Sequence, residues 1–546
     1  MNIGIDVGGT HTDAVLLDDG HSVVGTAKTL TRPEVAVSLS EVLASLLRDL
    51  PDRSPIKRVT VSTTLGLNSV LTGTGDPVGA LVTTGPGMPF DPEPHGVPVR
   101  ELSAKQDHRG VVLEPLKKGE ALAAAKSLVG DDKVFALVIA SKFGPKNPEI
   151  EEAIHGEALP VAPGPVTRAS QLFGALNFPR RLNSAVLNAG VSRLYGGFLS
   201  DSEKAAKDLG LSGAELLVLK SDGGVMSLGE AAFKPVDALA AGPAASLLGL
   251  WFLFRDETDK DILMVDMGGT STDLALLTGG LPLMIPEGLK IAGKNTLVRG
   301  LLTSSVALGG DTDLVYGGGR FVAEARRRGL ALALDPSGLE TRPPTLTDAL
   351  NVLGKAKVGD AAVSVASFER LGEDPAALAK LALDAVMTRL ADAVEAFLAD
   401  VNVRPVYTVN DFLVDRKLVP GKVVFLGGPA ASLAAVAEDW LKLPCASPPE
   451  ALYANALGAA LARPTFEAEL YADTALGVLS IPTLGVSRRI GREYNLDTAK
   501  KELLEALRGR EGARITLAES FNQLMDRGQT GRIIKVRAQG SPGLLA

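Results

Sequence analysis

The pattern of hydrophobic and polar residues occurs twice along the chain. Residues 3–17 (IGIDVGGTHTDAVLL) align without gaps on residues 263–277 (LMVDMGGTSTDLALL). Each copy has an apolar strand, a tight Gly-Gly turn and a second apolar strand that begins with Thr and Asp, which predicts a β-hairpin. The copies lie too far apart for a solenoid repeat, at about the length of a large domain. We therefore predict two similar halves.

Apolar runs predict further elements in the first half. A helix is expected over 34–49, where apolar residues recur with a helical period. Thr63-Thr64 stand at a predicted helix start, and the Pro- and Gly-rich residues 85–94 predict an irregular loop. A long helical pattern over 180–209 marks the expected boundary between the halves. Strands are expected over 22–26, 58–62, 78–83 and 133–140.

The second half contains the repeated hairpin and a later Gly-rich turn. Gly427-Gly428-Pro429 follows an apolar run over 422–426, and because Pro suits the first helical turn we expect a helix to begin there. Further elements are expected as a strand over 216–220 and as helices beginning at Ala241, over 375–400 and over 451–463. The last of these is rich in small residues and can approach another backbone closely.

The predicted organisation is an α/β protein with two lobes and a tail module. The first lobe covers residues 1–180, the second 181–463, and a mixed α and β module 464–546. Composition agrees with this class, since the 546 residues are 46% hydrophobic but only 4% aromatic. The formal net charge of -8 gives no basic surface for nucleic acid or an anionic membrane. An anionic ligand must therefore be held by local dipoles.

Cysteine usage and apolar runs point to the cytoplasm. Cys445 is the only cysteine, so a disulfide within the chain and a cysteine-based metal site are excluded. The longest apolar run, 244–254, is shorter than a membrane-spanning helix requires. Met1 leads directly into a strand with no basic leader. We expect a cytoplasmic protein with no membrane segment.

The repeated Asp-x-Gly-Gly-Thr string has the chemistry of an anion site. Two adjacent glycines let consecutive backbone N–H groups turn toward one anion, and the next Thr adds a hydroxyl donor. One copy is equally well explained as an ordinary hairpin corner, but a second gapless copy favours a ligand. Two facing turns would hold the phosphates of ATP from both sides. The predicted contacts are Gly8, Gly9, Thr10, Thr12, Gly268, Gly269, Thr270 and Thr272.

Two aspartates precede these glycines. Asp6 and Asp266 would repel a phosphate, so their expected partner is Mg²⁺, which is bound by one or two carboxylates, waters and phosphate oxygens. Both are therefore predicted metal ligands. For Asp13 and Asp273, metal binding and capping of the turn through side-chain to backbone bonds are equal alternatives.

The third Gly-rich turn is the expected base-binding element. Gly427 and Gly428 would let an adenine ring lie against bare backbone, with Pro429 at the start of the next helix. Taken alone, this turn is equally well explained as a plain strand-to-helix connection. Together with two phosphate hairpins it completes a nucleotide site.

These features resemble the actin, sugar kinase and heat-shock chaperone superfamily, in which two ribonuclease-H-like domains clamp ATP. Within it, the two hairpins, Thr63-Thr64 to Asn68 and VDALAAGPAAS (236–246) resemble the hydantoinase and oxoprolinase A-type family. The resemblance runs from residue 1 to about residue 460. The closing ESFNQLMDRGQTGRIIKVRA (519–538) is also similar in style.

The resemblance implies ATP- and Mg²⁺-dependent opening of a cyclic amide such as 5-oxoproline or a hydantoin. Phosphorylation of the ring carbonyl oxygen would make that oxygen a leaving group for attack by water. Asp6 and Asp266 would be the catalytic residues that organise the metal or orient the attacking oxygen, while Thr10 and Thr270 hold phosphates. The resemblance also implies an oligomer and a B-type hydantoinase subunit as a partner.

Two other functions use the same fold. A small-molecule kinase or an ATP-driven carboxylase subunit would use the cleft without ring opening. A regulatory ATPase would use its nucleotide state to control a partner. No separate peptide-binding β module or charged lid helix is evident after residue 460, which disfavours a chaperone.

One segment departs from the longer family members, which carry a His-bearing, Gly-rich stretch ahead of the domain's second half. The corresponding residues 306–313 here contain no His. Gly309, Gly310 and Asp311 are candidates for another phosphate or metal contact, and an exposed turn is an equal alternative.

Two isolated residues carry weaker hypotheses. His11 lies inside the first hairpin, where it either points at the ligand or faces solvent as an ordinary turn residue. Cys445 has only Lys442 as a basic neighbour in sequence, which favours a structural thiol over a nucleophile.

Overall fold

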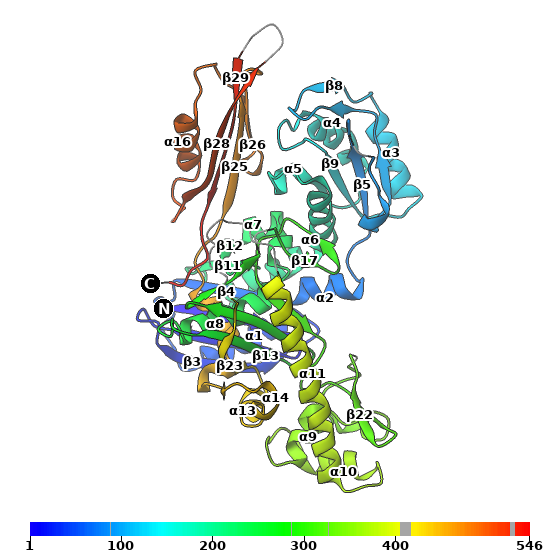
Figure 1. Cartoon of the computed structure of the whole chain (residues 1–546), viewed down its shortest axis with the longest axis vertical. Coiled ribbons are helices and arrows are strands. Elements are labelled where there is room, and N and C mark those ends of the chain that lie inside the picture. The colour runs from blue at the N-terminus through cyan, green and yellow to red at the C-terminus, as the bar shows by residue number, and fades with distance from the viewer. Residues whose placement is uncertain are drawn as a thin grey trace.

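The computed structural model describes residues 1–87, 89–285, 287–325, 327–403, 417–510, 512–524 and 530–545. Met88 in the predicted loop and residues 525–529 of the closing motif therefore lie outside the described residues. Figure 1 shows two sheets at the centre of the molecule, two smaller modules above them and a helical subdomain below. Across the ranges given above, no helix combines the length and apolar character needed to cross a membrane.

The first central sheet contains the first predicted hairpin. Its order is β12 (Val225–Ser227), β11 (Glu215–Leu219), β4 (Arg58–Thr63), β1 (Asn2–Val7), β2 (His11–Leu17) and β3 (Val23–Leu30). The β1–β2 pair is antiparallel, whereas β1–β4 and β4–β11 are parallel. The helices α1 (Val35–Leu46) and α6 (Phe178–Asp208) pack against each other beside this sheet.

The second central sheet repeats this arrangement. Its order is β15 (Leu281–Pro282), β14 (Thr272–Thr278), β13 (Asp261–Met267), β23 (Pro420–Leu426) and β24 (Cys445–Ala446), with β20 (Thr303–Val306) also pairing with β14. Again the hairpin pair is antiparallel and the next strand is parallel. Asp6 faces Asp13 across the first hairpin, and Asp266 faces Asp273 across the second. The predicted α/β fold with two ribonuclease-H-like lobes is confirmed.

The first sheet crosses the predicted boundary between residues 180 and 181. The strands β11 and β12 pair with β4 of the first lobe, although the prediction assigned residues 215–227 to the second. A separate parallel sheet is inserted between β4 and β11 in the chain. A long insertion of this kind cannot be recognised from hydrophobic periodicity, because its strands read like those of the main sheet.

The helices α8 (Ala241–Leu253) and α15 (Ala454–Leu461) pack backbone against backbone near the hairpins. A Cβ atom at Gly249 would lie 2.0 Å from Ala454 O, and one at Gly458 would lie 2.0 Å from Ala245 O. On its other side α15 meets β1, where a Cβ at Gly4 would lie 2.0 Å from Ala456 O. The predicted close approach of the small-residue helix is confirmed.

Two modules lie side by side above the central sheets (Figure 1). The inserted sheet has the order β10 (Val166–Arg168), β9 (Ala136–Ser141), β5 (Val78–Thr83) and β6 (Val99–Glu101), with α3 (Glu120–Gly130), α4 (Glu149–Ala158) and α5 (Ala169–Leu172). The C-terminal sheet has the order β27 (Val486–Arg489), β26 (Val478–Ile481), β25 (Glu467–Asp473), β29 (Thr530–Gln539) and β28 (Arg514–Leu524), covered by α16 (Leu496–Ala506). An ion pair of 2.6 Å between the half-buried Arg109 and the buried Asp473 joins the modules.

The remaining elements frame the central sheets. The lower subdomain contains β21 (Leu314–Gly317), β22 (Arg320–Ala323), α9 (Leu346–Val352), α10 (Ala361–Glu369) and α11 (Pro375–Val403). Short helices are α2 (Leu65–Thr72), α7 (Leu228–Phe233), α13 (Ala430–Ala434) and α14 (Glu438–Leu441). Short strands are β7 (Lys105–Gln106), β8 (Val112–Glu114), β16 (Met284–Ile285), β17 (Lys290–Ile291), β18 (Lys294–Asn295) and β19 (Gly300–Leu301).

Candidate functional site

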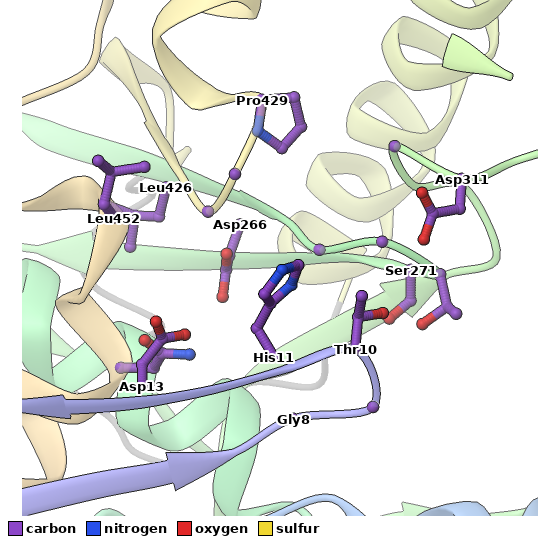
Figure 2. Close-up of a pocket in the computed structure, with 18 of the residues that line it drawn as sticks. Gly8, Thr10, His11, Asp13, Asp266, Ser271, Asp311, Leu426, Pro429 and Leu452 are labelled. Carbon is purple, nitrogen blue, oxygen red and sulfur yellow. The ribbon is translucent and has the colours of Figure 1, made fainter. Parts of the chain in front are cut away.

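A cleft of about 600 Å³ lies between the two hairpins (Figure 2). It brings together residues from both halves that are far apart in sequence. Most of the predicted site residues line it, namely Asp6, Gly8, Gly9, Thr10, Asp266, Gly268, Gly269, Thr270, Gly310, Gly427, Gly428 and Pro429. A cleft of this size is in the range of small-molecule and cofactor sites.

The two hairpin turns close in the same way. The N–H of Gly8 donates to His11 O over 3.1 Å, and the N–H of Gly268 donates to Ser271 O over 2.9 Å. The tips approach each other, since a Cβ at Gly269 would lie 2.8 Å from Thr10 Oγ1. A larger residue there would displace the side chains of Thr10 and Asp311. The repeated sequence therefore produces two matching turns at one cleft.

Thr12 and Thr272 do not line the cleft, contrary to the prediction that they contact the ligand. Both are fully buried. The Thr12 hydroxyl pairs with the Thr31 hydroxyl over 3.0 Å, and the Thr272 hydroxyl donates to Leu308 O over 2.6 Å. Thr12 is the second residue of β2 and Thr272 is the first residue of β14. Each points into the protein, because successive side chains of a strand alternate between faces. Their hydroxyls therefore fasten the two hairpins to the neighbouring chain at Thr31 and Leu308.

Asp6 is a buried carboxyl group at the floor of the cleft. Its Oδ2 atom accepts a hydrogen bond of 2.7 Å from Asn455 Nδ2, and its Oδ1 atom is buried without a hydrogen-bond partner. Burial, together with the charges of Asp13 and Asp266, raises the pKa of Asp6 to about 7, although hydrogen bonds from Ser62 and Asn455 oppose the rise. A carboxyl group held in this way gains from a bound cation.

Asp266 occupies the matching place on the second hairpin. Its Oδ2 atom accepts a hydrogen bond from the hydroxyl of Ser246, on α8. Burial and the charge of Asp13 raise the pKa of Asp266 as well. Asp13 forms an ion pair of 2.7 Å with Lys28 on β3, directly opposite it in register. Lys28 therefore lies among the carboxylates of the cleft and is paired with one of them.

These carboxylates fit a hydrated divalent cation. Asp6 offers an unpartnered oxygen, and Asp266 lines the same cleft beside it. Mg²⁺ is usually bound by one or two carboxylates, with waters and phosphate oxygens as its other ligands. Within the described part of the chain, no group of three or more His, Cys, Asp or Glu side chains is arranged to hold a metal. A metal here would depend on the bound phosphates.

The other end of the cleft is more apolar. Leu426, Pro429 and Leu452 line one side, as Figure 2 shows. Gly427 has a φ of 91°, and a Cβ there would lie 2.2 Å from Met267 O, so only glycine fits. Leu334 and Leu350 of the lower subdomain complete the wall. This end suits a flat apolar ring such as adenine.

The segment from Gly309 to Asp313 is buried, so the alternative of an exposed turn is wrong. The N–H groups of Gly310 and Asp311 donate to Gly268 O and Gly269 O over 2.9 Å and 2.7 Å. Gly310 and Asp311 line the cleft, but Gly309 lies behind the hairpin, where a Cβ would be 2.5 Å from Gly269 O. Gly309 therefore supports the second turn and does not face the ligand space.

Three further candidates are placed by the structure. His11 lines the cleft with its ring pointing inward (Figure 2), and burial lowers its pKa to about 4. Asp13 and Asp273 both line the cleft, and Asp13 is paired with Lys28. Burial raises the pKa of the Cys445 thiol to about 11, which leaves it protonated.

Sequence reasoning missed three side chains that hold the aspartates. Lys28 could have been found, because extending the predicted strand by register places it opposite Asp13. Ser246 stands in the quoted VDALAAGPAAS motif but gives no chemical signal there. Asn455 contacts a residue 449 positions away, so no local pattern indicates it.

Without metal and nucleotide, the protein should lose stability against unfolding as the pH rises from about 4 to about 7. The folded pKa of Asp6 is about 7, above the ordinary value of 3.8, so the native state binds more protons in this window. This difference between the folded and the ordinary pKa of Asp6 corresponds to roughly 4 kcal/mol of unfolding free energy. We expect Asp6→Asn to raise the free energy of unfolding by up to about that amount near pH 8, but not near pH 4.

The measurement is urea unfolding in EDTA without nucleotide at both pH values. The exposed Asp259→Asn is a control with the same change of charge. An equal gain for Asp6→Asn at both pH values would contradict the role of its proton.

Comparison with known proteins finds matching family models. A model of Hydantoinase/oxoprolinase matches residues 181–468, and a model of the Hydantoinase/oxoprolinase N-terminal region matches residues 2–159. Caprolactamase subunit alpha of Pseudomonas jessenii is 25% identical over 305 residues, which are 51% of this chain and 43% of that protein. Acetone carboxylase beta subunit of Xanthobacter autotrophicus is 26% identical over 314 residues, with the same two shares.

The chain spans about half the length of these relatives. Among solved structures, a nucleotide-free acetone carboxylase matches with a TM-score of 0.70 at 18% identity, covering 100% of this chain and 87% of that chain. The ATP-dependent caprolactamase from Pseudomonas jessenii matches with a TM-score of 0.67 at 16% identity, covering 99% and 87%. At these identities the two structures show a shared fold.

Proposed function

Because the chain belongs to the hydantoinase/oxoprolinase family, we propose that it uses ATP to open a cyclic amide in the cleft between the hairpins. The observation that carries the proposal is that both glycine turns, two aspartates and the Gly427 turn line one cleft. Relatives named for lactams support the substrate class, namely caprolactamase subunit alpha and the 5-oxoprolinase 1 of Arabidopsis thaliana, which is 29% identical over 231 residues.

The reaction begins with transfer of the γ-phosphoryl group to the ring carbonyl oxygen. The bond from phosphorus to the β–γ bridging oxygen breaks, and ADP leaves. Water then adds to the activated ring carbon and the ring C–N bond breaks as the nitrogen takes up a proton, which leaves an acyl phosphate. A second water hydrolyses this acyl phosphate to a carboxylic acid and phosphate.

The residues of the cleft have distinct roles in this proposal. The N–H groups of Gly8, Gly9, Gly268 and Gly269, together with Thr10 and Thr270, orient the phosphates, and Gly427, Gly428 and Pro429 hold the base. Mg²⁺, when bound at Asp6 and Asp266, would neutralise charge on the phosphates. Lys28 would place a positive charge near the transferring group. Positioning and charge neutralisation account for most of the rate in phosphoryl transfer.

A second candidate is an ATP-driven carboxylase subunit that phosphorylates an acceptor without ring opening. Acetone carboxylase beta subunit and the acetophenone carboxylase gamma subunit of Aromatoleum aromaticum, 24% identical over 402 residues, favour it. These relatives are subunits, as is caprolactamase subunit alpha. We therefore propose that the chain works with a second subunit, and a B-type hydantoinase subunit is the expected partner for ring opening.

The test is ADP release by the purified chain, alone and with its co-purifying subunit. We expect 5-oxoproline, a hydantoin or caprolactam to stimulate ADP release at least about tenfold, since an acceptor completes the transfer site. Acetone or acetophenone with bicarbonate serves as the comparison. Stimulation by the ketones alone would refute the amide proposal and support the carboxylase candidate.

A further inference from the structure

We propose that Asn455 positions the catalytic carboxylate of Asp6 for the bound metal–nucleotide complex. This inference rests on the proposed function, because it assigns the residue a task in ATP turnover. Asn455 is the second residue of α15, and its side chain lines the cleft. Among the described residues, its side chain hydrogen-bonds to Asp6 and to the N–H of Ala456 and not to either hairpin turn, so its effect passes through Asp6.

The direction of the hydrogen bond is fixed by a second contact of the same amide. Asn455 Oδ1 accepts the N–H of Ala456 over 3.1 Å, so Nδ2 is the atom that faces Asp6 and donates over 2.7 Å. This bond occupies Oδ2 of Asp6 and leaves the buried Oδ1 without a partner. The amide of Asn455 therefore fixes one oxygen of the carboxyl group, while the other oxygen is buried and has the Ser62 hydroxyl as a neighbour.

Asn455 is itself held rigidly. The helix α15 lies against both β1 and α8 at van der Waals distance from their backbones, as the blocked positions Gly4 and Gly458 show. Just before the helix, Ala451 O accepts the N–H of Gly427 over 3.1 Å. The segment that carries Asn455 therefore also holds the turn assigned to the base. A donor on such a support is oriented before the ligand arrives, which is what positioning requires.

The second hairpin has the same device. Ser246 on α8 donates to Oδ2 of Asp266, as Asn455 on α15 does to Asp6. The two donors come from neighbouring helices that pack through Gly249 and Gly458. The α8–α15 pair thus holds both aspartates at a fixed separation. In both halves a helix side chain donates to Oδ2 of the aspartate, although the donor residue differs. The repetition favours a positioning role over an accidental contact.

The test uses Asn455→Leu, which keeps the volume of the side chain but cannot donate, and Asn455→Ala as a second variant. Loss of a residue that orients a metal ligand typically costs 10–100-fold in metal affinity or activity. We expect kcat of MgATP turnover to fall by about that factor with KM for ATP changed less than about threefold. By calorimetry with a non-hydrolysable ATP analogue, Mg²⁺ should strengthen binding less than in the wild type, while binding in EDTA stays unchanged.

The matched control is Tyr453→Phe, which removes a hydroxyl at the start of the same helix and outside the cleft. It should behave as wild type. Wild-type kcat and Mg²⁺ dependence in both Asn455 variants would overturn the inference and leave the proposed function standing. An equal loss of affinity with Mg²⁺ and in EDTA would also overturn it, because that result indicates a merely structural role. A wild-type chain that binds no MgATP would overturn both.

Discussion

Asp266→Asn is expected to lower MgATP-dependent turnover roughly 10²–10³-fold, the scale found when one preorganised charge-stabilising group is removed from an active site. The substitution keeps the size of the side chain and an oxygen that can accept the Ser246 hydroxyl. The hairpin should therefore fold as before. The loss would report the missing charge at the metal, and it should appear in kcat more than in KM.

The same variant should show the opposite effect, a gain, in its affinity for ATP without metal. Without a metal, the carboxylates of Asp6, Asp13 and Asp266 repel the phosphates of ATP, because all three line one cleft and Lys28 is already paired with Asp13. Removing one of these charges should strengthen the binding of metal-free ATP. We expect Asp266→Asn to bind ATP more tightly than wild type in EDTA and more weakly in excess Mg²⁺, both measured by calorimetry.

Asp259→Asn is the matched control for this experiment. It removes the same charge from an exposed position shortly before β13, outside the cleft, and should leave turnover and both affinities unchanged. Turnover by Asp266→Asn within about tenfold of wild type, or weaker binding in both buffers, would contradict a metal role for Asp266.

The sequence was sufficient for the fold and for most of the cleft because of its internal repeat. A gapless second copy of Asp-x-Gly-Gly-Thr predicts two matching hairpins, and their registers place Asp6 opposite Asp13 and Asp266 opposite Asp273. The glycines were informative for a physical reason. At Gly427 the φ is positive and any side chain would collide with the backbone of the neighbouring strand, so the residue type itself carries the geometry.

The residues that the sequence did not indicate act across long separations. Asn455 reaches Asp6 only because α15 returns to the first sheet at the end of the second lobe. Thr12 and Thr272 were assigned to the ligand because they belong to the repeat, but the alternation of the strand turns them inward. Repetition therefore identified a shared local structure without separating the residues that support it from those that face the ligand.

The contact between α8 and α15 gives the largest expected effect on stability. In Gly458→Ala the new methyl group would lie 2.0 Å from Ala245 O and 2.7 Å from Gly249 N. Both are backbone atoms of α8, so the helices must move apart. Overpacking of this kind costs about 1–3 kcal/mol and sometimes more, which exceeds the gain of up to about 1 kcal/mol from replacing a helical glycine by alanine.

We expect Gly458→Ala to lower the free energy of the unfolding transition that includes these helices by about 2 kcal/mol. Turnover should fall as well, since α15 carries Asn455 and α8 carries Ser246. Gly196→Ala is the matched control. Gly196 lies on an exposed part of α6, with no heavy atom within 4 Å of its Cβ position, so the same substitution should stabilise the protein by about 0.5–1 kcal/mol.

Urea unfolding of both variants, followed by the fluorescence of Trp251 on α8, measures the difference. Opposite signs for two identical Gly→Ala changes in helices can arise only from the surroundings of the glycine. Equal shifts in the two variants would show that α8 and α15 can separate at little cost, and the hold on Asp6 and Asp266 would then have to come from the hairpins themselves.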